Sequence, residues 1–168
     1  PETYNFSRPV TAEEIVARIV VEGNKRMDEG IRGWRDRAAD LGFKPYEMVV
    51  LASIVEKETG KAEERGMIAS VFHNRLRIGM PLQSDPTVIY GIPNFNGNLT
   101  KEDLKTPGPY NTYLNTGLPP TPICNPGLDA LKAVLYPDDS DRLYFVARGD
   151  GSHQFSSTYK EHSQAVNN

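Results

Sequence analysis

Two glutamates follow a strongly apolar helical run, Leu-Ala-Ser-Ile-Val-Glu-Lys-Glu-Thr at residues 51–59. With Pro45 as the first helical residue and about 100° of rotation per residue, Glu58 falls beside Leu51 on the apolar stripe. A carboxyl group at the edge of an apolar face has a raised pKa and can donate a proton near neutral pH. Glu58 is therefore the candidate acid, and Glu56, which points to one side, is a supporting candidate. By periodicity alone, two surface glutamates in a last helical turn are the more frequent explanation.

The composition excludes several other chemistries. A net charge of −3, from 19 basic and 22 acidic residues without a basic stripe, argues against nucleic-acid binding. The single cysteine, Cys124, excludes an internal disulfide and a Cys-rich zinc site. The three histidines lack the spacing of a zinc protease, and no Gly-rich phosphate loop is present. We therefore expect no metal and no cofactor.

A long irregular segment, residues 79–126, is rich in Pro, Gly, Asn, Thr and Tyr. A loop of this length in a compact domain is usually functional. Its neutral polar groups and aromatic rings suit a polyhydroxylated substrate. Taken singly, each is more often a turn former or a satisfied loop residue. The candidates are Gln83, Asp85, Tyr90, Asn111, Tyr113 and Asn125.

The first half of the chain is predicted to be helical. Thr11 and Glu14 form a capping box for a helix over residues 11–40, in which three glycines favour a kink or break. Helices over 45–59 and 62–77 follow, and the three should pack on one another. The inner side of the first helix is predicted to carry Ile15, Ile19, Val20, Met27 and Ile31.

The second half is predicted to be mixed. A turn, Arg-Gly-Asp-Gly at 148–151, separates two short β-rich segments. The whole chain, residues 1–168, is expected to be a single α+β domain: a helical N-terminal half carrying Glu58, a Pro-rich cleft loop and a small antiparallel sheet near the C-terminus. The expected elements are helical turns at 100–104, a helix at 126–136 capped by Asn125, strands at 142–147 and 152–156, and a helix at 159–166.

Six strings, in order over nearly the whole chain, resemble the MltG/YceG-like endolytic murein transglycosylases. Together they are highly specific for that family. They are Leu-Ala-Ser-Ile-Val-Glu-Lys-Glu-Thr (51–59), Ala-Ser-Val-Phe-His-Asn-Arg-Leu (69–76), Leu-Gln-Ser-Asp-Pro-Thr-Val-Ile-Tyr-Gly (82–91), Tyr-Asn-Thr-Tyr (110–113), Gly-Leu-Pro-Pro (117–120) and Leu-Tyr-Phe-Val-Ala (143–147).

The resemblance implies a role for Glu58, which matches the family's catalytic glutamate. The implied reaction cleaves the β-1,4 bond between N-acetylmuramic acid and N-acetylglucosamine without water and leaves a 1,6-anhydromuramic end. Such chemistry needs one acid/base. The resemblance also implies substrate-binding roles for cleft residues, with Glu56 supporting the site. These cleft residues are Gln83, Asp85, Tyr110, Asn111, Tyr113, Asn125 and His153.

Asp85 leaves two alternatives open. As the residue before Pro86 it is biased away from helix, and its simplest role is to brace the turn that follows. If it faced Glu58 across the cleft, the pair could instead hydrolyse the glycan as a muramidase does. A third alternative is a peptidoglycan-binding module without turnover, acting as a scaffold for the synthases.

The resemblance also implies a cellular setting. Family members are usually single-pass inner-membrane proteins with a LysM-like region ahead of the catalytic domain. This chain opens on Pro-Glu-Thr-Tyr and resembles the catalytic domain alone. The expected location is the periplasmic face of the membrane, with the parent protein anchored by one N-terminal span. The expected partners are peptidoglycan glycan strands and peptidoglycan synthases.

Overall fold

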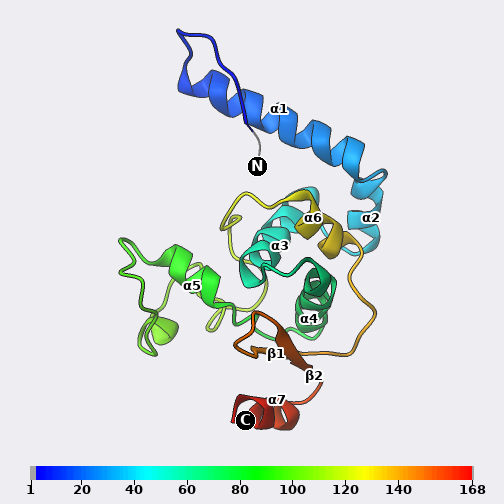
Figure 1. Cartoon of the computed structure of the whole chain (residues 1–168), viewed down its shortest axis with the longest axis vertical. Helices are drawn as coiled ribbons and strands as arrows, with labels where there is room; N and C mark the ends of the chain where they lie inside the picture. Colours follow the sequence, from blue (N-terminus) through cyan, green and yellow to red (C-terminus); the bar gives the residue numbers. More distant parts are fainter. Residues whose placement is uncertain (1–2, 168) are drawn as a thin grey trace.

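The structure, a computed structural model, describes residues 3–167 and confirms the α+β class. Helices dominate, and the strands form a two-stranded antiparallel sheet near the C-terminus (Figure 1). The α-helices are α1 (Ala12–Gly30), α2 (Trp34–Asp40), α3 (Pro45–Glu58), α4 (Arg65–Arg77), α5 (Asp85–Gly91), α6 (Leu128–Leu135) and α7 (Tyr159–Val166). The single-turn 3-10 helices are η1 (Ala62–Glu64) and η2 (Asp103–Lys105), and the strands are β1 (Tyr144–Ala147) and β2 (His153–Ser156).

The core forms where α3 packs against α4 and α6 (Figure 1). Leu51, Ile54 and Val55 of α3 are fully buried, and each buried side chain of this size contributes about 1.5–3 kcal/mol. His73 of α4 bonds through Nε2 to the Val134 carbonyl of α6 at 2.8 Å. The predicted helix over 45–59 is confirmed to within one residue. The packing of α4 and α6 against it holds the helix that carries Glu58 in place.

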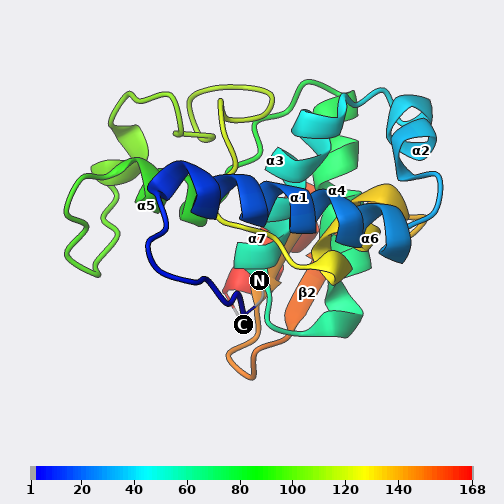
Figure 2. The ribbon, with the colours of Figure 1, turned by 90° about the horizontal axis from the view of Figure 1, so that it is seen from above.

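The predicted helix over 11–40 is two helices. Its capping box is present, since the Thr11 hydroxyl accepts from the Glu14 N–H at 3.2 Å. The break falls at residues 31–33, where Gly33 has φ +68°, a conformation that favours glycine. Of the predicted inner face, Met27 and Ile31 are buried. The prediction is wrong for Ile19 and Val20, because α1 lies apart from the core (Figure 1), although it crosses in front of the core when seen from above (Figure 2).

The predicted long loop contains a helix that the sequence did not indicate. The rule that the residue before proline avoids helical geometry was applied too strongly, because Asp85 and Pro86 open α5. Proline is favourable in a first helical turn, where its missing N–H has no partner in any case. The turns expected at 100–104 occur slightly later, as η2.

The C-terminal elements were predicted closely. In the sheet Tyr144 pairs with Ser156 and Ala147 with His153, and α7 has the predicted bounds. Asn125 does not cap α6, which is a correction: the N-cap is Gly127, two residues later. No helix within residues 3–167 is both long and apolar enough to cross a membrane.

Candidate active site

Glu58, the last residue of α3, opens into a cavity of about 300 Å³. The Glu58 residue is mostly buried, and its neighbours in the cavity come from five other parts of the chain. The cavity is lined by Glu58, Arg75, Gln83, Asp85, Tyr113, Tyr144, Phe145, Tyr159 and His162. Of the residues predicted for the site, it therefore brings together Glu58, Gln83, Asp85 and Tyr113.

The surroundings of Glu58 raise its pKa to about 7. Burial, which penalises the charged form, is the largest cause, and the negative charge of Asp85 adds to it. A hydrogen bond from the Ser84 hydroxyl acts in the opposite direction, as do the charges of His153 and Arg75. Near neutral pH the group therefore exists in both protonation states, as a residue that must first donate and then accept a proton requires.

Ser84 is held by a buried chain of hydroxyl groups. Its N–H donates to Thr112 Oγ1 at 3.0 Å. Thr87 Oγ1 lies 2.8 Å from Thr112 Oγ1 and donates to the Ser84 carbonyl at 2.7 Å. The sequence analysis missed all three residues. These contacts fix the backbone from which the Ser84 hydroxyl reaches Glu58.

Gln83, directly before Ser84, has φ +49°. This left-handed conformation is uncommon for any residue except glycine, and it persists only where the surrounding structure holds it. The Gln83 N–H donates to the Thr112 carbonyl at 3.0 Å. The strained backbone thus turns an exposed Gln83 side chain into the cavity and Ser84 toward the acid.

Asp85 and Tyr113 form a pair on the cavity wall. The Tyr113 hydroxyl donates to Asp85 Oδ1 at 2.5 Å. Burial, with help from this bond, raises the pKa of Tyr113, which stays protonated. One oxygen of the Asp85 carboxylate is therefore occupied by a protein donor.

Arg75 is a buried cavity residue that the sequence analysis also missed. Its Nε donates to the Leu143 carbonyl at 2.7 Å and its Nη1 to the Leu82 carbonyl at 2.6 Å. Its guanidinium lies 5.5 Å from the centre of the Tyr144 ring. The signal was present: residue 75 follows Phe72 by three positions, which places an arginine on the apolar face of α4. Its bonds join α4, the segment before Gln83 and the start of the sheet.

His153 lies close to the cavity without lining it. Its Nδ1 is 2.6 Å from Glu64 Oε2, and its backbone N–H donates to Glu64 Oε1 at 3.0 Å. The pair joins the start of β2 to η1, shortly after Glu58. His153 nevertheless acts on the acid, because its charge lowers the pKa of Glu58. Its predicted contact with substrate stays a prediction.

Three other predicted residues have their polar groups or rings engaged outside the cavity. Asn111 is buried and braces the loop, donating to the carbonyls of Leu104 and Thr106 at 3.0 and 2.8 Å. The Tyr110 ring packs on Tyr90 at 4.9 Å. Glu56 accepts the N–H of Gly127 at 3.2 Å, so it supports the start of α6.

Asn125 is exposed and lines a different groove, beside α1. That placement is a consequence of the late start of α6, which leaves Asn125 on the preceding loop. None of these placements tests a role in substrate binding directly.

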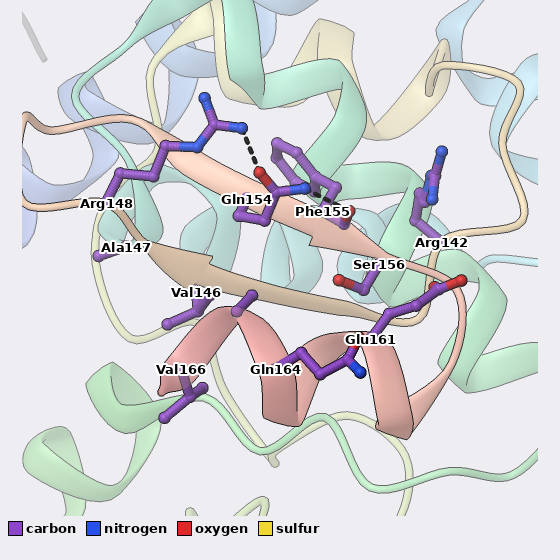
Figure 3. A pocket seen from close by; sticks show the side chains of 11 residues that line it. Arg142, Val146, Ala147, Arg148, Gln154, Phe155, Ser156, Glu161, Gln164 and Val166 are labelled. Carbon is purple, nitrogen blue, oxygen red and sulfur yellow. Dashed lines mark hydrogen bonds between the residues drawn. The ribbon is translucent and has the colours of Figure 1, made fainter. Parts of the chain in front are cut away.

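A larger hollow of about 600 Å³ lies along the sheet and α7 (Figure 3). Its acidic residue, Glu161, accepts the backbone N–H groups of Ser157 and Thr158 at 3.1 and 3.2 Å. These bonds, with those of the capping box, lower the pKa of Glu161. This carboxylate is unsuited to proton donation. The Glu58 cavity is the candidate active site. Within residues 3–167, no three or more His, Cys, Asp or Glu side chains are grouped so that they could hold a metal ion.

Comparisons with known proteins agree with the resemblance noted from the sequence. An endolytic murein transglycosylase of Bacillus subtilis (strain 168) is 38% identical over 98% of this chain and 45% of its own length. One of Streptococcus pneumoniae (strain D39) is 32% identical over 99% of this chain and 30% of its own. The crystal structure of a YceG-like protein from Listeria monocytogenes matches with a TM-score of 0.84 at 42% identity, over 98% of this chain and 52% of that one.

The chain thus spans about half or less of each of these relatives. The YceG-like family matches residues 1–168, from the first residue to the last. The chain belongs to the YceG-like family.

Proposed function

We propose that residues 1–168 form a single catalytic domain that cleaves peptidoglycan glycan strands internally as a lytic transglycosylase. The observation that carries the proposal is Glu58, whose pKa is raised to about 7 in a cavity lined by polar and aromatic side chains together with the charged Arg75 and Asp85. The relatives from Bacillus and Streptococcus, which bear the name endolytic murein transglycosylase, support the same reading.

The reaction proceeds in two proton transfers. Protonated Glu58 gives its proton to the oxygen that links N-acetylmuramic acid to N-acetylglucosamine, and the bond from C1 to that oxygen breaks. The glucosamine part leaves with a free 4-hydroxyl. Glu58, now a carboxylate, takes the proton from the C6 hydroxyl of the muramic residue as O6 bonds to C1. The strand then ends in 1,6-anhydromuramic acid and no water is consumed.

The surroundings of Glu58 stabilise both of the protonation states that these two proton transfers need. Ser84 stabilises the carboxylate form through its hydrogen bond, whereas burial stabilises the protonated form. The bond from Tyr113 to Asp85 occupies one oxygen of the second carboxylate that a hydrolase would use to activate water or attack the sugar. Asp85 nevertheless lines the same cavity, so hydrolysis is the main competing function.

The test is mass spectrometry of uncrosslinked glycan strands after incubation with the wild-type domain and with Glu58→Gln. We expect internal cuts with anhydromuramic ends from the wild type and a loss of about 10²–10⁴-fold in rate in the variant. Reducing ends, lost on Asp85→Asn, would instead establish hydrolysis. Binding without products from either form would leave a peptidoglycan-binding module.

The setting of the parent protein is also a proposal. Glycan strands lie outside the cytoplasm, which supports an extracytoplasmic domain that limits strand length during synthesis. The membrane anchor, the LysM-like region and contacts with peptidoglycan synthases are expectations for the remainder of the parent protein. A reporter enzyme that is active only outside the cytoplasm, fused after Asn168 in the parent protein, should show activity. Activity of a reporter that works only in the cytoplasm, fused at the same place, would contradict this setting.

A further inference from the structure

Three rings gather where α7 meets the sheet at the Glu58 cavity. The His162 ring stacks on Tyr144 with centroids 5.2 Å apart and planes 21° apart. Tyr159, one turn earlier on α7, meets the same Tyr144 ring at 6.0 Å. All three side chains line the cavity that contains Glu58. None of them was singled out by the sequence as a substrate-binding residue.

The exposure of Tyr159 shows that packing alone does not explain this cluster. Its relative exposure is 70%, although the ring touches two aromatic neighbours. A tyrosine that served only to attach α7 to the sheet would bury its ring, because that burial is its main contribution. Tyr159 instead leaves an aromatic surface open at the cavity.

His162 adds a polar group without a partner. Among the buried side-chain nitrogen and oxygen atoms of the part of the chain that is described, only Arg65 Nε and His162 Nδ1 have no hydrogen-bond partner. Burial lowers the pKa of His162, with a smaller effect from the charge of Arg75. The ring is therefore neutral at neutral pH. Its Nδ1 is buried, so Nε2, which is not among these buried atoms, is the nitrogen that a ligand can reach as a donor or an acceptor.

The opposite side of α7 has a different character. There Glu161 and Gln164 border the hollow along the sheet (Figure 3). The Glu161 carboxylate is engaged in capping its own helix. Aromatic rings and an unpartnered nitrogen thus occur on the side of α7 that borders the catalytic cavity.

We propose that Tyr144, Tyr159 and His162 form a sugar-binding platform of the Glu58 cavity, on which His162 hydrogen-bonds a sugar of the glycan strand. A pyranose ring presents apolar C–H groups on its face and hydroxyl and acetamido groups at its edge. An aromatic surface with one neutral polar group matches both. The inference deepens the proposed function and rests on it for the substrate class.

The platform is tested by binding, which does not depend on turnover. The ligand is a peptide-free, uncrosslinked oligosaccharide of alternating N-acetylglucosamine and N-acetylmuramic acid, titrated by calorimetry into the Glu58→Gln form. Adding Tyr159→Ala should weaken binding about tenfold, whereas Tyr159→Phe should keep the affinity within about twofold. The matched control is Tyr46→Ala, since Tyr46 is 55% exposed but lies at the other end of α3, about 18 Å from Glu58 along the helix.

The hydrogen bond is tested separately by His162→Phe, which keeps an aromatic ring against Tyr144 but removes both nitrogens. We expect about tenfold weaker binding in the Glu58→Gln form. In the active domain the same change should raise KM while kcat stays within about twofold, because a contact made equally before and during the reaction affects binding alone. A merely structural role would instead lower the thermal unfolding midpoint and leave KM unchanged.

Unchanged affinity in Tyr159→Ala would overturn the platform, and unchanged affinity in His162→Phe would overturn its hydrogen bond. No binding of the glycan by the Glu58→Gln form would overturn both. The proposed function fails on a different measurement, the absence of anhydromuramic ends from the wild-type domain. If the wild-type domain made those ends and Tyr159→Ala bound the glycan normally, the proposed function would stand and the platform would be wrong.

Discussion

The helical core and the irregular rim contribute to the site in different ways. The core, formed by α3, α4 and α6, supplies the acid from the end of a helix that is buried for most of its length. The rim, formed by residues 79–126, the sheet and α7, supplies the other residues that line the cavity, except Arg75 of α4. The core therefore fixes the position of the proton donor, whereas Ser84, Asp85 and His153 of the rim adjust its pKa and the rim shapes the space for a ligand.

The two regions also differ in what holds them. Apolar burial stabilises α3, with Leu51 and Val55 fully inaccessible. The rim depends on specific hydrogen bonds, such as those of Asn111 to two loop carbonyls. Changes in the core should mainly alter stability, and changes in the rim should mainly alter the behaviour of Glu58. The following measurements test that division.

The largest effect on stability is expected from the pH dependence of Glu58. Its pKa in the folded domain, about 7, lies above its ordinary value of 4.5. Between these values the folded state binds a proton that the unfolded state releases, so the contribution to stability is complete below about pH 4.5 and is lost as the pH rises through 7. Up to about 3 kcal/mol of unfolding free energy should disappear in this way.

Urea unfolding at pH 5 and pH 8 measures this effect, with Glu58→Gln as the matched control. Groups other than Glu58 affect both proteins alike, so the difference between the two pH dependences isolates this carboxyl group. We expect the wild type to lose more stability than the variant between the two pH values. Parallel curves would show that burial in the folded domain does not favour the protonated form of Glu58.

The core was the more predictable region because its signals are periodic. The repeat of apolar residues on α3 located both the helix and the orientation of Glu58. The same reasoning placed Ile19 and Val20 in the core, whereas in the structure they are 39% and 54% exposed. Periodicity identifies an apolar face, but the tertiary arrangement decides whether a second element covers it.

A smaller effect is expected for Ser84→Ala, which acts on the acid from the rim. Removing the hydroxyl removes the hydrogen bond that stabilises the Glu58 carboxylate, so the pKa of Glu58 should rise further above 7. The alkaline limb of the kcat/KM profile, which reports loss of the Glu58 proton, should therefore move to higher pH by about one unit.

Ser70→Ala is the control for this change. Ser70 is also buried and bonds through Oγ to Ser140 Oγ at 2.8 Å, but it does not line the cavity. Its substitution should lower stability without moving the pH profile. If both variants left the profile in place, Ser84 would have a purely structural role and the division between core and rim would weaken.

The rim resisted prediction because its contacts join residues far apart in sequence. The bond from Ser84 to Glu58 spans 26 positions, and no local pattern marks it. Likewise, Tyr113 was identified as polar and aromatic, but its pairing with Asp85 depends on how the loop returns to α5. The types of several site residues were thus readable from the sequence, while their partners required the fold.

The smallest effect is expected at Gln83, whose left-handed backbone, with φ +49°, lowers the stability of the folded rim. Gln83→Gly can adopt this conformation without strain, whereas Gln83→Ala cannot, and both remove the side chain from the cavity. The glycine variant should therefore be more stable than the alanine variant by about 1 kcal/mol in urea unfolding, with equal losses of glycan affinity. Equal stabilities would mean that the left-handed backbone at this position relaxes in solution. Unequal affinities would mean that the backbone conformation itself, rather than the side chain alone, shapes the cavity beside Glu58.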